Sequence, residues 1–162
     1  MHYELYMSAA LAEAAAAAAS GERADGAVAV LDEAMVAHGR EQIDATGDPT
    51  AHAVIVALRE TARRLGHRSL SGLTVFAVVE PCAMCVGALL QSDADGLVYA
   101  LADPSEGACG SAVQLANADG LTRHLRVVSG ILQAEAAELR PDLATSRGVA
   151  VRGAISGAAV AR

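Results

Sequence analysis

The chain of 162 residues contains no lysine and no tryptophan, and aromatic side chains make up only 2% of it. A protein that stacks nucleic-acid bases on many aromatic rings is excluded by this shortage. Positive charge is scarce as well, because 12 arginines face 19 acidic residues and the net charge is −7. The composition therefore gives no overall basic surface for phosphate contacts, although it still allows a local basic patch.

Long apolar segments are also missing. The alanine run at 14–19 is short, only weakly apolar and flanked by Glu13 and Glu22, so it predicts no membrane span. The first residues show neither the basic region nor the leucine-rich region of a signal peptide. We therefore expect a cytoplasmic protein that does not contact a membrane.

The length fits one domain, and 53% hydrophobic with 19% charged residues is typical of a folded chain. After Pro141 the sequence turns to glycine, alanine, serine, valine and arginine with little periodicity. We expect a folded domain over residues 1–145 and a C-terminal tail over residues 146–162.

Apolar periodicity, β-branched runs and turn residues predict ten secondary-structure elements. The expected helices cover 3–20, 51–65, 82–91, 111–118 and 131–139, and the expected strands cover 27–31, 34–38, 73–79, 96–101 and 125–129. Thr50 or Asp48 is expected to cap the second helix.

The order of these elements predicts a mixed α/β sheet. Only Asp32 and Glu33 separate the first two strands, which is the length of an antiparallel hairpin connection. The three later strands alternate with helices, which favours parallel pairing through right-handed crossovers. We expect one five-stranded sheet with helices on both faces.

Two short segments carry metal-binding residue types. Thr-Ala-His-Ala-Val contains His52 in a predicted first helical turn, and Glu-Pro-Cys-Ala-Met-Cys places Cys82 and Cys85 in another. One imidazole and two thiolates suit tetrahedral Zn²⁺ with a fourth position left for water. The partial positive charge at a helix N-terminus favours the thiolates that zinc requires.

The same residues allow two other interpretations. Cys82 and Cys85 could be small core residues beside a surface histidine, or they could form a redox-active C-x-x-C pair. An odd cysteine count, with Cys109 as the third, argues against a disulfide framework. The combination of both segments favours zinc over either alternative.

The sequence resembles the cytidine/deoxycytidylate deaminase superfamily, and within it the bacterial tRNA-specific adenosine deaminases and their nucleobase-deaminase relatives. The two metal segments carry the resemblance, together with Asp-Gly-Ala-Val at 25–28, Val-Tyr-Ala at 98–100 and Gly-Ala-Cys-Gly-Ser at 107–111. It implies a three-layer α/β/α cytidine-deaminase-like fold. It also implies one Zn²⁺ per subunit, held by His52, Cys82 and Cys85 with water as fourth ligand.

The resemblance further implies a homodimer and hydrolytic deamination of an amino-bearing purine or pyrimidine ring. Two substrates stay open, a small nucleobase or nucleoside and an adenosine in tRNA. The residues at 111–118 would form the short helix that precedes a parallel last strand in the tRNA-type branch.

The sequence departs from the family at position 54, where the family has a glutamate that shuttles protons and this chain has Val54. General acid–base groups typically contribute about 10²–10⁴-fold to a rate, so we predict an inactive or severely impaired deaminase. Glu80 is a weak candidate for a replacement. A deliberate substitution, a natural loss and altered chemistry each fit Val54, and the alternative function is a non-catalytic subunit that pairs with an active deaminase.

The resemblance also gives four candidate substrate-binding residues, namely Glu41, Thr50, Ala53 and Pro81. Glu41 occupies a predicted loop, where it either selects an amino-bearing ring at the pocket mouth or is a solvated side chain.

Overall fold

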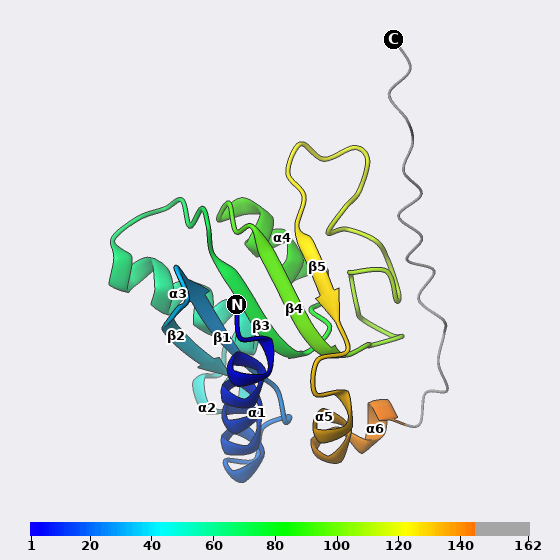
Figure 1. Cartoon of the computed structure of the whole chain (residues 1–162). Coiled ribbons are helices and arrows are strands. Elements are labelled where there is room, and N and C mark those ends of the chain that lie inside the picture. The colour runs from blue at the N-terminus through cyan, green and yellow to red at the C-terminus, as the bar shows by residue number, and fades with distance from the viewer. Residues whose placement is uncertain (145–162) are drawn as a thin grey trace.

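The computed structural model describes residues 1–144, which form one five-stranded sheet in the order β2-β1-β3-β4-β5 (Figure 1). The strands are β1 (Gly26–Leu31), β2 (Ala34–Arg40), β3 (Thr74–Val79), β4 (Gly96–Leu101) and β5 (Arg126–Ser129). The helices are α1 (Tyr3–Ala19), α2 (Ile43–Thr46), α3 (Ala53–Leu65), α4 (Ala83–Gln91), α5 (Gln133–Leu139) and α6 (Pro141–Ala144).

Strand pairing follows the predicted pattern. β1 is antiparallel to β2 and β3, whereas β3, β4 and β5 are parallel. Asp32 and Glu33 both have positive φ angles, 49° and 64°, which is the conformation of a tight hairpin turn whose twist matches its strands. The expected hairpin and the expected parallel crossovers are both confirmed.

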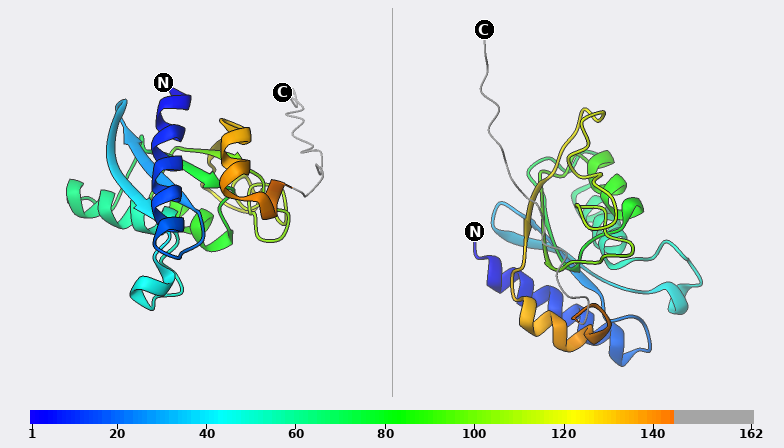
Figure 2. Two further views of the ribbon diagram at one scale, coloured as in Figure 1. Left: turned by 90° about the horizontal axis from the view of Figure 1, so that it is seen from below. Right: turned by 90° about the vertical axis from the view of Figure 1, so that its right-hand side faces the viewer.

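Helices cover both faces of the sheet and make three layers. α1 and α5 lie on one face, with α3 and α4 on the other (Figure 2). Successive side chains of each strand point to opposite faces of the sheet. Val28, Phe76 and Val98 belong to the core on the α1 side. Ala29, Val75 and Leu97 belong to the core under α3 and α4. The central strands are buried on both sides, which explains their continuous apolar sequences.

α3 approaches β2 closely enough that only glycine fits at position 39. A Cβ atom on Gly39 would lie 2.3 Å from the Ala53 carbonyl oxygen and 2.5 Å from the Ala57 nitrogen. Such distances are far below van der Waals contact, so any side chain would push the helix outward. Gly39 therefore fixes the height of α3, and with it the position of His52, above the sheet.

The segment at 111–118 is not a helix, and that prediction is wrong. Its backbone bonds run across a loop instead, from Ala112 N–H to the Gly107 oxygen and from Leu115 N–H to the Ala108 oxygen. The Glu80 carboxylate also accepts hydrogen bonds from the N–H and the hydroxyl of Ser111, and these bonds hold the start of the segment in a loop conformation. β5 is parallel to β4 even without this helix.

Smaller differences concern the ends of elements. The segment at 41–47 contains the single turn α2, and α6 begins at Pro141. The second long helix begins at Ala53 rather than at Ala51. The expected tail over 146–162 lies outside the described residues. Within residues 1–144, no helix combines the length and the apolar character that a membrane crossing requires.

Candidate metal centre and adjoining pocket

His52 and Cys82 each occupy the N-cap of a helix, α3 and α4 respectively, with extended backbone angles. The expected capping by Thr50 or Asp48 is wrong. Asp48 instead accepts hydrogen bonds from the Thr50 N–H at 2.8 Å and the Thr50 hydroxyl at 2.6 Å, which stabilises the loop before α3. Both helices therefore begin at a candidate metal ligand.

The three candidate ligands converge as zinc requires. Nδ1 of His52 lies 3.6 Å from Sγ of Cys82 and 3.6 Å from Sγ of Cys85, and all three ligand atoms lie within 4.8 Å of one another. Tetrahedral bonds of about 2.3 Å to sulfur and about 2.0 Å to nitrogen would put N and S about 3.6 Å apart. The residues thus fit a zinc ion without rearrangement.

The start of α4 favours a thiolate at Cys82. The neighbouring Cys85 thiol, the N–H groups of Cys85 and Met84 and the nearby His52 lower the pKa of Cys82 to about 5, against the effect of burial. The pKa of Cys85 is raised, by its hydrogen bond to Cys82 and by burial. A divalent cation would offset the repulsion between two adjacent thiolates, because it interacts favourably with both.

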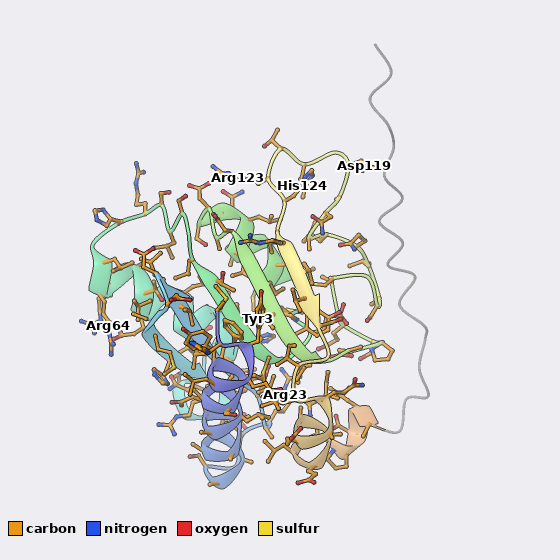
Figure 3. All side chains as sticks on the ribbon, viewed as in Figure 1. Tyr3, Arg23, Arg64, Asp119, Arg123 and His124 are labelled. Atoms are coloured by element: carbon orange, nitrogen blue, oxygen red, sulfur yellow. The ribbon has the colours of Figure 1, made fainter. Side chains whose placement is uncertain are left out.

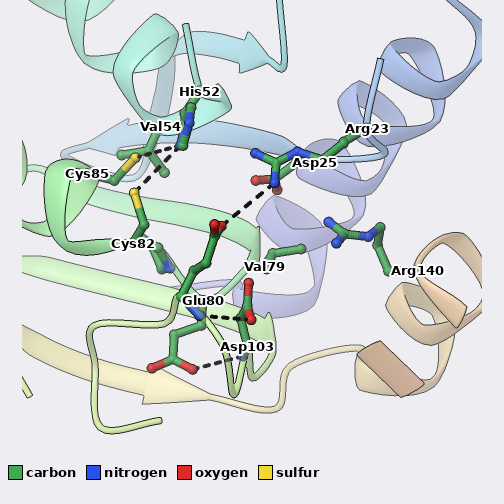
Figure 4. A pocket seen from close by; sticks show the side chains of 12 residues that line it. Arg23, Asp25, His52, Val54, Val79, Glu80, Cys82, Cys85, Asp103 and Arg140 are labelled. Carbon is green, nitrogen blue, oxygen red and sulfur yellow. Dashed lines mark hydrogen bonds and ion pairs between the residues drawn. The ribbon is translucent and has the colours of Figure 1, made fainter. Parts of the chain in front are cut away.

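A cavity opens beside these ligands, and Val54 forms part of its wall. His52, Cys82 and Cys85 line it together with Val54, whose side chain is 3% exposed (Figure 4). The cavity volume is about 20 Å³, which is room for about one water molecule. Apart from the candidate ligand His52 at its N-cap, α3 contributes only the aliphatic side chain of Val54 to the wall of this cavity.

Glu80 lines the cavity, but its carboxylate is engaged elsewhere. Its oxygens accept hydrogen bonds from the N–H groups of Asp103 at 3.0 Å, Cys109 at 2.9 Å and Ser111 at 3.2 Å, and from the Ser111 hydroxyl. A Cβ on Gly107 would lie 2.4 Å from this carboxylate, so the loop wraps it closely. These contacts favour a structural role for Glu80 over proton transfer.

Glu41 is neither a solvated side chain nor exposed at the pocket mouth. It is 1% exposed, and its Oε1 accepts hydrogen bonds from Nε of Arg23 at 3.1 Å and from a terminal nitrogen of Arg23 at 2.6 Å. The other oxygen, Oε2, is buried and accepts no hydrogen bond from the described residues. A buried carboxylate oxygen without a partner is costly, so Glu41 stands out among the acidic side chains.

The other candidate substrate-binding residues are placed differently. Pro81 lines the cavity, Ala53 is buried, and the Thr50 hydroxyl is engaged by Asp48. Cys109 is buried away from the metal-binding group, and burial followed by the charge of Glu80 raises its pKa to about 12.

Sequence reasoning missed five charged residues on the cavity wall, namely Arg23, Asp25, Asp103, Glu106 and Arg140. They come from the segment before β1, the loop after β4 and the end of α5. Burial and the charge of Glu41 raise the pKa of Asp25 to about 7, although Arg140 and the N–H groups of Gly26 and Val79 oppose the shift. Asp25 directly precedes Gly26, the first residue of β1, and the sequence marks it only as part of the Asp-Gly-Ala-Val segment that carries the resemblance.

A family model for the cytidine and deoxycytidylate deaminase zinc-binding region matches residues 1–101, which is well over half of the chain. The chain belongs to this deaminase family. The tRNA-specific adenosine deaminase of Bacillus subtilis is 33% identical to it over 132 residues, covering 82% of each protein. That of Haemophilus influenzae is 37% identical over 136 residues, covering 83% of this chain and 79% of the relative.

Solved deaminase structures share the fold. A tRNA:A34 deaminase aligns with a TM-score of 0.81 at 33% identity, covering 83% of this chain and 98% of that one. The guanine deaminase of Bacillus subtilis aligns with a TM-score of 0.60 at 32% identity, covering 63% and 66%. The zinc-binding family and the His52, Cys82 and Cys85 group agree, so this member of the family has a site placed to bind a metal ion.

Proposed function

We propose that this chain is a zinc-binding deaminase-family protein that keeps its metal centre and base pocket but has lost most of its hydrolytic activity. One observation carries the proposal. Val54 lines the cavity that contains all three metal-ligating side chains, at the position where the family has its proton-shuttling glutamate.

The residues of the chain have separate tasks in this proposal. His52, Cys82 and Cys85 hold the ion, and a zinc ion bound there supplies an activated water to the amino-bearing carbon of a ring. Val54 can neither accept the proton of that water nor deliver one to the ring or the leaving ammonia. Losing a positioned acid–base group typically slows a reaction by about 10²–10⁴-fold, which is the minimum loss we expect.

The substrate is an amino-bearing purine or pyrimidine ring, and the pocket belongs to a homodimer in the cytoplasm. The relatives that act on tRNA support an adenosine in tRNA. The net charge of −7 supports a small nucleobase or nucleoside, because phosphate contacts need basic surface.

The proposal is tested by restoring the glutamate. Zinc-loaded Val54→Glu protein should release ammonia from at least one member of a panel of nucleobases, nucleosides and tRNA. We expect a rise of at least about 10²-fold over the unchanged chain. Val54→Gln is the matched control, because glutamine has the length of glutamate but cannot act as a general acid or base. A folded, zinc-loaded Val54→Glu protein that stays silent on the whole panel would contradict the proposal.

A non-catalytic subunit is the second candidate function, and exposed apolar residues near α4 favour it. Met84 on α4 is 37% exposed, and Leu121, which borders a groove with Gly87 and Leu90 of α4, is 39% exposed. Such a surface suits contact with another deaminase chain. Co-purification with an active deaminase would support this function, and a purely self-associated protein with turnover of its own would exclude it.

A further inference from the structure

Arg23 lies between the cavity and solvent. Its side chain lines the cavity and is also 48% exposed, so one side of it faces the cavity and the other faces water. From the segment before β1 it points toward the metal ligands (Figure 4). The Arg23 guanidinium therefore covers an entrance to the candidate metal centre.

Each of the three guanidinium nitrogens of Arg23 has an acidic partner. Nε and Nη2 donate to Oε1 of Glu41, at 3.1 and 2.6 Å. Nη1 lies 3.8 Å from Oε2 of Glu106. Glu41 directly follows β2 and Glu106 lies in the loop after β4, so two distant parts of the chain hold the same guanidinium.

The two acidic partners hold Arg23 with unequal strength. Glu106 has a side chain that is 59% exposed, and an exposed pair of this kind contributes little. Glu41 is 1% exposed, and Arg23 is its only ion-pair partner among residues 1–144. Movement of Arg23 away from Glu41 would leave a buried carboxylate without a counter-ion, which is strongly unfavourable. The buried Glu41 therefore keeps Arg23 over the cavity.

The cavity under Arg23 is too small for a heterocycle. Its volume is about 20 Å³, which is room for about one water molecule, and the three candidate metal ligands line this same space. Pockets that hold small organic ligands typically measure about 300–1,000 Å³. A purine or pyrimidine ring therefore cannot enter while Arg23 stays in place.

We propose that Arg23 is a self-inhibitory residue: Glu41 holds its guanidinium over the base pocket and closes the metal centre to heterocyclic rings. The inference rests on the proposed function of the cavity as a base pocket, and it adds a second cause of low activity beside Val54. Closure slows the unchanged chain and Val54→Glu alike, so the expected ratio of their rates stays the same.

The test measures how fast a ring reaches the metal, so it needs no turnover. The zinc-loaded protein is mixed with excess 1,10-phenanthroline, a neutral planar heterocycle that binds zinc, and the zinc left on the protein is measured after rapid desalting. Attack on the bound ion gives a rate proportional to chelator concentration, whereas loss through unfolding gives a rate independent of it. Minor open states are typically populated at about 0.1–10%, so Arg23→Ala should raise the concentration-dependent rate at least about 10-fold.

A second variant separates opening of the pocket from loss of stability. Arg23→Ala combined with Glu41→Met removes both charges and fills the site of Glu41 with an apolar side chain of similar volume, so no buried charge is left unpaired. This double variant should keep the faster concentration-dependent rate. The matched control is Arg123→Ala, because Arg123 is 49% exposed, pairs with Asp93 at 2.8 Å and lies at the opposite end of the molecule from Arg23 (Figure 3). Its rate should equal that of the unchanged chain.

Three results would each overturn the inference. The first is an equal concentration-dependent rate in all four proteins, and the second is a rate in the double variant that returns to that of the unchanged chain. The third is an equal acceleration in Arg123→Ala. The proposed function fails separately, when zinc-loaded Val54→Glu releases no ammonia, so the two failures are distinguishable.

Discussion

The two walls of the cavity are built in different ways. On the metal wall, the starts of α3 and α4 supply all three ligands, and two short sequence segments contain them. On the opposite wall, the charged groups come from the segment before β1, the loop after β4 and the end of α5, and only the folded sheet brings them together. Two short segments of sequence therefore contain the whole metal site, whereas the charged wall is assembled from segments far apart in the chain.

The largest effect is expected on the metal wall, when one of its three ligands is removed. Cys85→Ser takes away one thiolate of a three-residue site, and we expect the purified protein to lose its zinc and to melt at a lower temperature. Metal analysis and a thermal melt measure both. Cys109→Ser is the matched control, because Cys109 is also buried but lies outside the metal-binding group. Full zinc content in Cys85→Ser would show that another residue completes the site.

Removing the arginine of the opposite wall should cost less, but still a large share of the stability. Arg23→Ala leaves the buried Glu41 carboxylate without a counter-ion, and we expect a loss of about 3 kcal/mol. Urea unfolding measures it. Arg59→Ala, which breaks an exposed pair with Asp48, should leave the midpoint nearly unchanged. An equal effect of both substitutions would show that the Arg23–Glu41 pair is no more important than a surface contact.

A smaller effect of opposite sign is expected at Asp25, and it depends on pH. The pKa of Asp25 is raised to about 7 in the folded protein, so the folded state holds this proton more tightly than the unfolded state. Stability is therefore lost as the pH rises from about 4 toward 7 and above. Asp25→Asn cannot ionise, so it should be more stable than the unchanged chain at pH 8.

The difference between these two proteins should become small near pH 4, where Asp25 is protonated in the folded state and about half protonated in the unfolded state. Urea unfolding of the zinc-loaded pair at both pH values gives the comparison. Because both proteins share the same metal centre, changes in zinc binding with pH cancel. A constant difference at both pH values would show that Asp25 does not titrate as described.

The sequence allowed most of the fold and the metal wall to be predicted, for a physical reason. Strands such as Thr74–Val79 are continuous β-branched runs, and the hairpin and helix boundaries depend on nearby residues. Loop 103–111 could not be predicted, because the distant Glu80 carboxylate binds its N–H groups. Glu41 was expected in solvent or at the pocket mouth, since nothing near it in the sequence reveals Arg23 as its partner.

His52 and Cys82 are the N-cap residues of α3 and α4, so an ion bound to them would also hold the first turn of each helix. The first N–H groups of α4, from Met84 and Cys85, lie against the Cys82 thiolate, so the charge that attracts an ion also orders the first turn of the helix. Chelation should then be visible in amide hydrogen exchange, as faster exchange confined to the first turns of α3 and α4. In this protein a bound ion would stabilise the backbone at the starts of two helices in addition to any part it takes in a reaction.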